Sequence, residues 1–209
     1  MGPLAGAVLE LALAGAARWW ARGAEVPVSV NLSAANVSDL DLPAKVVAVL
    51  DRHGLPPRAL TLELVEDTLM SSPDRARTVL AELRAIGVSA SIDDYGTGYS
   101  SLAYLRHLPA DELKLDRTFT TDLTDDPRAA AIVRHTVGLA HALGLRLVAE
   151  GVEDLATLDV LGAFGCDVAQ GYAIAGPMPV EEFLVWLQDG RRSPARSEPV
   201  PRQVARRPV

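Results

Sequence analysis

Short apolar runs alternate with longer amphipathic segments along most of the chain. The runs that we predict as strands are Val28 to Leu32, Leu60 to Val65, Val88 to Ile92, Glu112 to Leu115, Arg146 to Ala149 and Asp167 to Ala169. Most of them are short and rich in apolar residues, which is typical of parallel strands that are covered on both faces. The pattern therefore predicts a parallel sheet with helices packed against it.

Apolar residues spaced three and four apart predict helices between these strands. The segment that starts at Ser72 and Pro73 is an example, because Ser is a common helix cap and Pro suits the first helical position. A glycine, common just beyond a helix, ends each of four predicted helices. These glycines are Gly54, Gly87, Gly144 and Gly165.

The six strand and helix units fit either an open doubly wound sheet or a closed barrel. A complete eight-unit barrel takes roughly 250 residues, so six units need about three-quarters of that number. Residues 1–189 come close to this length. We therefore predict an α/β fold, an incomplete TIM-type (β/α) barrel that lacks its first strands.

The last twenty residues differ in composition from the rest of the chain. Residues 190–209 are rich in Pro and carry six Arg and one Glu, a net charge of +5, so residues 1–189 hold −12 of the total charge of −7. We predict one domain over residues 1–189, followed by a disordered Pro/Arg-rich tail.

The overall composition argues against several classes of protein. A net charge of −7 speaks against general nucleic-acid binding, although gathered carboxylates can hold divalent cations. Cys166 is the only cysteine, so no intrachain disulfide forms and a cytoplasmic location is expected. The apolar residues 4–17 are interrupted by Glu10 and lack the basic start of a signal peptide, and we expect no membrane span.

Charged and amide side chains follow the predicted strands. At or near the strand ends lie Asn31, Glu63, Glu66, Asp93, Asp94, Lys114, Glu150 and Gln170. In barrel enzymes the carboxyl ends of the strands carry the active site. Polar residues also mark strand ends merely because they face water, but six strands with the same feature favour a functional rim.

The residue types at this rim limit its chemistry. Carboxylate and amide oxygens suit Mg²⁺ or Mn²⁺, whereas zinc prefers His and Cys, and the four histidines show no ligand spacing. The adjacent Asp93 and Asp94 reach one site only if the strand ends there, since neighbours on a strand face opposite sides. Lys114 either stabilises negative charge at this site or forms a salt bridge with Asp116 or a strand-end acid.

Six motifs in order resemble those of the EAL domain family. They are VNLS at 30–33, ELVE at 63–66, DDYGTGYSSL at 93–102, KLD at 114–116, AEGVE at 149–153 and QGY at 170–172. The resemblance implies a modified TIM barrel that hydrolyses cyclic di-GMP to linear pGpG with two Mg²⁺ or Mn²⁺ ions. It also implies a role for each matching residue.

On that resemblance the metal ligands are Asn31, Glu63, Asp93, Asp94 and Glu150. Lys114, Glu150 and Glu66 take part in catalysis, Glu66 by bracing the loop after the paired aspartates. Gln170 and Asn31 line the substrate site.

The sequence also departs from the family pattern. It contains no Glu-Ala-Leu motif, which in the family lies on an early strand, so we expect the barrel to lack that strand and to expose sheet edges. Three readings stay open: an active phosphodiesterase, a sensor that binds cyclic di-GMP without cutting it, and an interaction domain. The exposed edges leave room for a homodimer or for pairing with another chain.

Overall fold

Six parallel strands form one sheet whose order follows the chain. The computed structural model describes residues 2–65, 73–96 and 105–189. The strands are β1 (Val28–Leu32), β2 (Leu60–Val65), β3 (Ser89–Tyr95), β4 (Glu112–Leu115), β5 (Arg146–Ala149) and β6 (Val168–Ala169). Each strand pairs in parallel with the next one along the chain.

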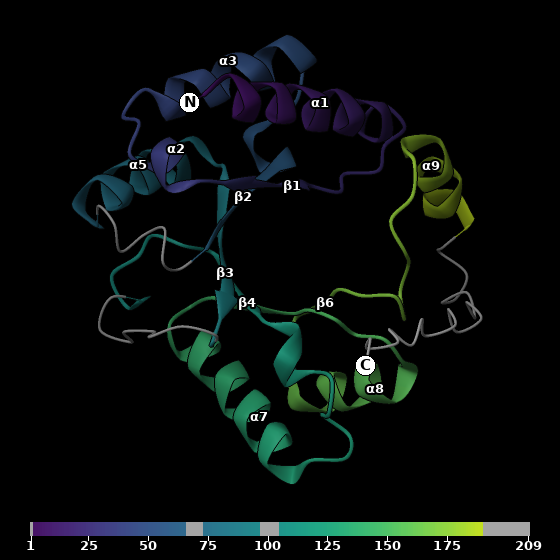
Figure 1. Cartoon of the computed structure of the whole chain (residues 1–209). Coiled ribbons are helices and arrows are strands. Elements are labelled where there is room, and N and C mark those ends of the chain that lie inside the picture. The colour runs from purple at the N-terminus through teal and green to yellow at the C-terminus, as the bar shows by residue number, and fades with distance from the viewer. Residues whose placement is uncertain (1, 66–72, 97–104, 190–209) are drawn as a thin grey trace, which may run out of the picture.

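Helices cover the outside of the curved sheet (Figure 1). They are α1 (Pro3–Trp20), α2 (Ala34–Val37), α3 (Leu42–His53), α5 (Pro73–Ile86), α7 (Pro127–Ala142), α8 (Leu155–Phe164) and α9 (Val180–Asp189), with short 3-10 helices η1 (Pro57–Ala59) and η2 (Arg117–Phe119). Within the described residues β1 pairs only with β2, and β6 pairs only with β5. The predicted incomplete (β/α) barrel is therefore confirmed.

The predicted helix ends agree closely with the structure. Gly54 and Gly165 follow α3 and α8 with φ of +64° and +81°, in the left-handed region that favours glycine. At the start of α8 the Asp154 side chain accepts a hydrogen bond of 2.7 Å from the Thr157 amide, which satisfies a free donor of the first turn. These signals fix the end of α3 and both ends of α8.

The two faces of the central strands differ in chemistry. On β2, Leu60, Leu62 and Leu64 are fully buried and belong to the hydrophobic core. Thr61 and Glu63 alternate with them and so point to the other face, inside the curve of the sheet. The apolar face thus anchors each strand against the helices, while the inner face is free to carry polar groups.

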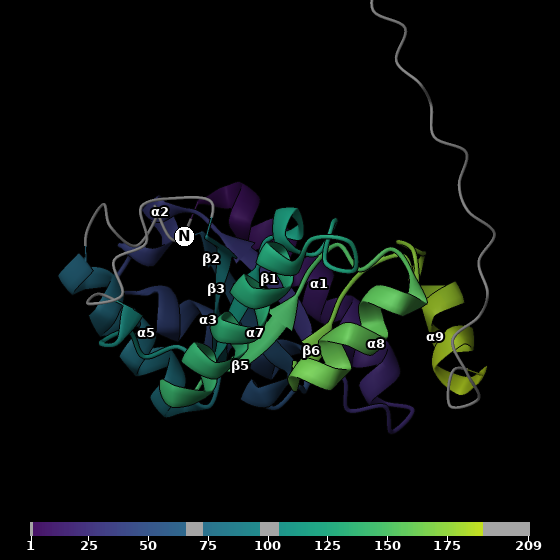
Figure 2. The same cartoon turned by 90° about the horizontal axis from the view of Figure 1, so that it is seen from below.

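Helices from the two ends of the described chain pack against each other. Arg18 of α1 forms a 2.8 Å ion pair with Glu181 of α9, and the Trp19 ring meets the Phe183 ring edge-on at 5.1 Å. Phe183 also stacks on Trp186 at 5.9 Å. Trp19 thus packs α1 against α9, Trp186 packs within α9, and α9 lies beside α1 in Figure 1. Figure 2 shows the helices from a second direction.

Among the described residues, none of the helices is both long enough and apolar enough to cross a bilayer.

Candidate functional site

The predicted site residues lie at neighbouring strand ends. Asn31 of β1 and Glu63 of β2 are register partners, and Asp93 of β3 is the partner of Val65 two residues beyond Glu63. Glu150 directly follows β5, and its amide donates to the Leu115 carbonyl at the end of β4. The sheet therefore gathers side chains from β1, β2, β3 and the end of β5 at one rim.

Lys114 is the centre of this rim. Its Nζ lies 2.9 Å from Glu63 Oε2, 2.9 Å from Asp93 Oδ1 and 2.7 Å from Glu150 Oε1. Only 5% of the Lys114 side chain is exposed. One buried ammonium group thus joins carboxylates from β2, β3 and the end of β5.

The contacts of Lys114 fix its protonation state. Burial alone would lower the pKa of its ammonium group, but the hydrogen bonds with Glu150, Glu63 and Asp93 outweigh burial and raise the pKa above its ordinary value. Lys114 is therefore a permanent cation at neutral pH. Of the two readings that the sequence left open, the salt bridge with strand-end acids is present, and it places the same charge inside the candidate site.

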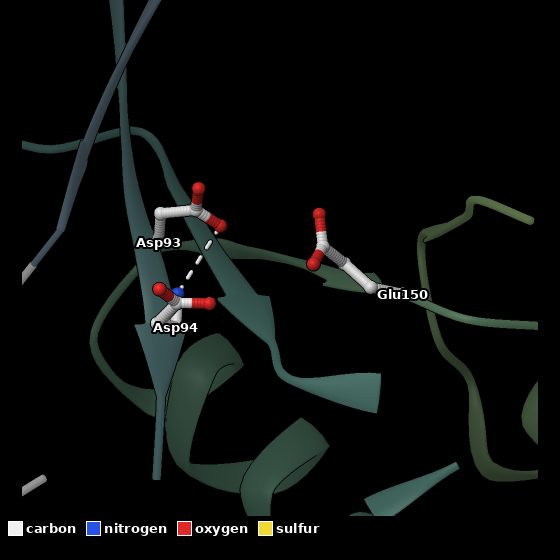
Figure 3. Close-up of side chains that lie close together, drawn as sticks. All are labelled: Asp93, Asp94 and Glu150. Atoms are coloured by element: carbon white, nitrogen blue, oxygen red, sulfur yellow. Dashed lines mark hydrogen bonds between the residues drawn. The ribbon is translucent and has the colours of Figure 1, made fainter. Parts of the chain in front are cut away.

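Two acids of this ion cluster, Asp93 and Glu150, also form a group of carboxylates with Asp94. Figure 3 shows Asp93 and Asp94 on β3 facing Glu150 across the rim. One carboxylate oxygen from each of the three lies within 4.8 Å of those of the others. This spacing suits a divalent cation bound between them.

The paired aspartates reach one site by a route that the sequence did not predict. We expected β3 to end at Ile92, but it continues to Tyr95 and its register with β4 shifts between Ile92 and Tyr95. Asp94 adopts a φ of +57°, which is unusual for a residue other than glycine. The irregular backbone turns both carboxylates toward Glu150, as a β-bulge does when it redirects a side chain.

The pKa values of two acids in this group, Glu150 and Asp94, lie above their ordinary values. Burial raises the pKa of Glu150, although the hydrogen bond with Lys114 opposes the rise. Burial, followed by the charges of Asp93 and Asp116, raises the pKa of Asp94. A bound cation would relieve this crowding of negative charge.

The donor set fits Mg²⁺ or Mn²⁺. Every member of the three-residue group is a carboxylate, and Glu63 adds a fourth within reach of Lys114. Hard divalent cations prefer such oxygen ligands. Two of the histidines pair with acids elsewhere, His53 with Glu10 and His141 with Asp167.

Of the remaining predicted site residues, the structure describes Asn31 and Gln170 but not Glu66. Asn31 is exposed beside Glu63, and Gln170 is exposed just after β6, where its backbone bonds to Ala149 and Val152. Glu66 lies outside the described residues, as do Thr97 and Gly98 of the DDYGTGYSSL motif. The roles of Asn31, Gln170 and Glu66 stay predictions.

The sequence analysis did not predict the close packing contact between Gly151, which follows Glu150, and Arg117. Gly151 has a φ of +67°, and a Cβ on it would lie 2.4 Å from Arg117 Cβ and 3.2 Å from Arg117 Cα. No side chain fits there without moving η2. The glycine directly after the candidate ligand Glu150 was the sequence feature that could have indicated this close contact.

We expect Gly151→Ala to destabilise the protein more than Gly144→Ala. Gly144 also has a left-handed φ, +75°, but a Cβ on it would have no neighbour within 4 Å, so its substitution costs only about 1–2 kcal/mol of backbone strain. The clash at Gly151 adds about 1–3 kcal/mol. Urea unfolding of both variants measures the difference, and equal costs would show that the contact with Arg117 is not tight.

Comparison with known proteins identifies the family. The family model described as "EAL domain" matches residues 1–177. The chain belongs to the EAL domain family. A cyclic di-GMP phosphodiesterase of Pseudomonas aeruginosa is 39% identical over 188 residues, which cover 90% of this chain and 32% of that protein. The bifunctional diguanylate cyclase/cyclic di-GMP phosphodiesterase MucR of the same species is 46% identical over 169 residues, or 80% of this chain and 25% of that protein.

Solved structures of EAL proteins have the same fold. The "PaMucR Phosphodiesterase, c-di-GMP complex" matches with a TM-score of 0.80 and 42% identity, covering 86% of this chain and 73% of that one. The EAL domain of Mycobacterium smegmatis DcpA matches with a TM-score of 0.82 and 36% identity, covering 87% and 82%. This EAL chain spans about a quarter to a third of the length of the two curated relatives named above.

Proposed function

We propose that this EAL chain is a metal-dependent phosphodiesterase domain that hydrolyses cyclic di-GMP to pGpG. The observation that carries the proposal is the contact of one buried ammonium group, Lys114, with three carboxylates from separate strands. A relative 39% identical over 90% of the chain carries the name cyclic di-GMP phosphodiesterase, and the MucR neighbour is a c-di-GMP complex.

We assign the metal-holding role to the carboxylates of Asp93, Asp94, Glu150 and Glu63, together with the Asn31 amide oxygen. Bound there, two Mg²⁺ or Mn²⁺ ions would neutralise charge on the phosphodiester and activate the attacking water. The raised pKa of Asp94 and of Glu150 supports this assignment, because such groups gain most from a nearby cation.

The chain's own residues have separate tasks in this proposal. Lys114 stays protonated and places a fixed positive charge where negative charge develops on the phosphoryl oxygens. Glu63, Asp93 and Glu150 hold that ammonium group in position through their hydrogen bonds. Exposed Asn31 and Gln170 contact the dinucleotide, and Glu66 braces the loop after the paired aspartates.

Incubation of the purified chain with cyclic di-GMP and Mn²⁺ tests the proposal directly. Chromatography should detect pGpG with Mn²⁺ present and none when EDTA replaces it. Binding of cyclic di-GMP without product would instead indicate a sensor, and absence of both would indicate an interaction domain.

We also propose that the free edges of β1 and β6 pair with a strand of a second copy. Within the described residues neither edge has a strand partner, and unpaired edges favour such pairing. Light scattering would detect the dimer. Separately, we propose that the chain is located in the cytoplasm.

A further inference from the structure

The turn after β4 touches the backbone of Glu150. Thr120, which follows η2, is 1% exposed, and its Oγ1 lies 2.5 Å from the Glu150 carbonyl oxygen and 2.9 Å from the Arg117 carbonyl oxygen. A threonine hydroxyl has one proton to donate, and the shorter contact is with Glu150. The hydroxyl therefore satisfies a carbonyl of a candidate metal ligand.

The backbone of Glu150 is held on both sides. Its amide donates to the Leu115 carbonyl at 3.1 Å, and its carbonyl accepts from Thr120. The next residue, Gly151, approaches Arg117 so closely that a Cβ would lie 2.4 Å from Arg117 Cβ. Glu150 thus cannot shift without a matching shift of the turn that contains η2 and Thr120.

The same turn also supports the opposite side of the carboxylate group. Gly96, two residues after Asp94, faces the Phe119 ring, and a Cβ on Gly96 would lie 2.7 Å from Phe119 Cε2. Residues 117–120 therefore contact the chain just beyond both Asp94 and Glu150. They connect the two halves of the group across the rim.

We propose that Thr120 is a positioning residue, whose hydroxyl sets the place of Glu150 relative to Lys114, Asp93 and Asp94. The inference rests on the proposed metal site and deepens it. Without the hydroxyl the Glu150 carbonyl loses its donor, and the backbone moves to regain one. The Glu150 carboxylate then leaves the position that the other acids require.

The test compares Mn²⁺ binding, measured by calorimetry, in the full chain and in matched variants. Thr120→Val keeps the shape of the side chain but removes the hydroxyl, and we expect Mn²⁺ affinity to fall about tenfold, as for other residues that orient metal ligands. Thr120→Ser should restore wild-type affinity. Thr121→Val is the control, because exposed Thr121 bonds to the same Arg117 carbonyl at 2.9 Å.

A metal-free readout separates this inference from the proposed activity. In a crystal structure of Thr120→Val the distance from Lys114 Nζ to Glu150 Oε1 should exceed its present 2.7 Å. An unchanged distance, or unchanged Mn²⁺ affinity, overturns the role of Thr120 even if the chain cleaves cyclic di-GMP. Conversely, the wild-type chain could form no pGpG while Thr120→Val still binds Mn²⁺ more weakly than wild type. That result would support the positioning role of Thr120 and contradict only the proposed hydrolysis of cyclic di-GMP. Thr120→Ala serves the same comparison if Thr120→Val does not fold.

Discussion

Replacing Lys114 with Met should destabilise the metal-free chain by about 3–5 kcal/mol, the usual cost of removing one partner from a buried ion pair. Lys114 Nζ lies within 2.9 Å of carboxylate oxygens of Glu63, Asp93 and Glu150. Met has nearly the same length but carries no charge, so three acids would face one another without a cation. Urea unfolding in EDTA measures the loss.

Divalent cations should recover part of that stability. In Lys114→Met, Mn²⁺ bound among Glu63, Asp93 and Glu150 supplies the positive charge that the ammonium group no longer provides. Because Mn²⁺ bound there binds only the folded chain, it stabilises the folded state. Lys45→Met is the matched control, because Lys45, the chain's other lysine, pairs with Asp39 at 2.7 Å but is 41% exposed. It should change stability little. A small effect of Lys114→Met in EDTA would mean that Lys114 does not hold the acids together.

Asp93→Asn should weaken Mn²⁺ binding by at least about a hundredfold, since residues that merely orient metal ligands already contribute ten- to hundredfold. Asp93 belongs both to the ion cluster of Lys114 and to the group with Asp94 and Glu150. The amide lacks the negative charge of the carboxylate and presents one oxygen in place of two. Calorimetric titration with Mn²⁺ measures the change.

Asp159→Asn provides the comparison for this prediction. Asp159 is exposed on the surface of α8, away from the strand ends that carry the candidate site. Its substitution alters the net charge of the chain by the same amount as Asp93→Asn. If the two variants weakened Mn²⁺ binding equally, the metal assignment would be wrong.

Local patterns in the sequence were sufficient to predict the six strands and the helices α3, α5, α7 and α8 between them. The β-strands Val28–Leu32, Leu60–Val65, Glu112–Leu115 and Arg146–Ala149 have the predicted bounds, because short segments rich in apolar residues, separated by helical patterns and glycines, mark the strands of a parallel sheet. The meeting of Glu63, Asp93, Lys114 and Glu150 followed from the rule that the carboxyl ends of parallel strands share one rim.

Features that depend on contacts between distant segments could not be predicted. The left-handed Asp94 and the register shift in β3 arise where β3 meets β4, and nothing in the run of residues 88–92 indicates them. Likewise the contacts of η2 with Gly96 and Gly151 join segments more than twenty residues apart. Glycine after a candidate ligand indicates a close approach but not its partner.

The most direct test of the central claim is an anomalous diffraction map of crystals soaked in Mn²⁺. We expect a peak at the strand ends, with carboxylate oxygens of Asp93, Asp94 and Glu150 around it. A saturating soak that produces no peak at this rim, or a peak only elsewhere on the chain, would contradict it.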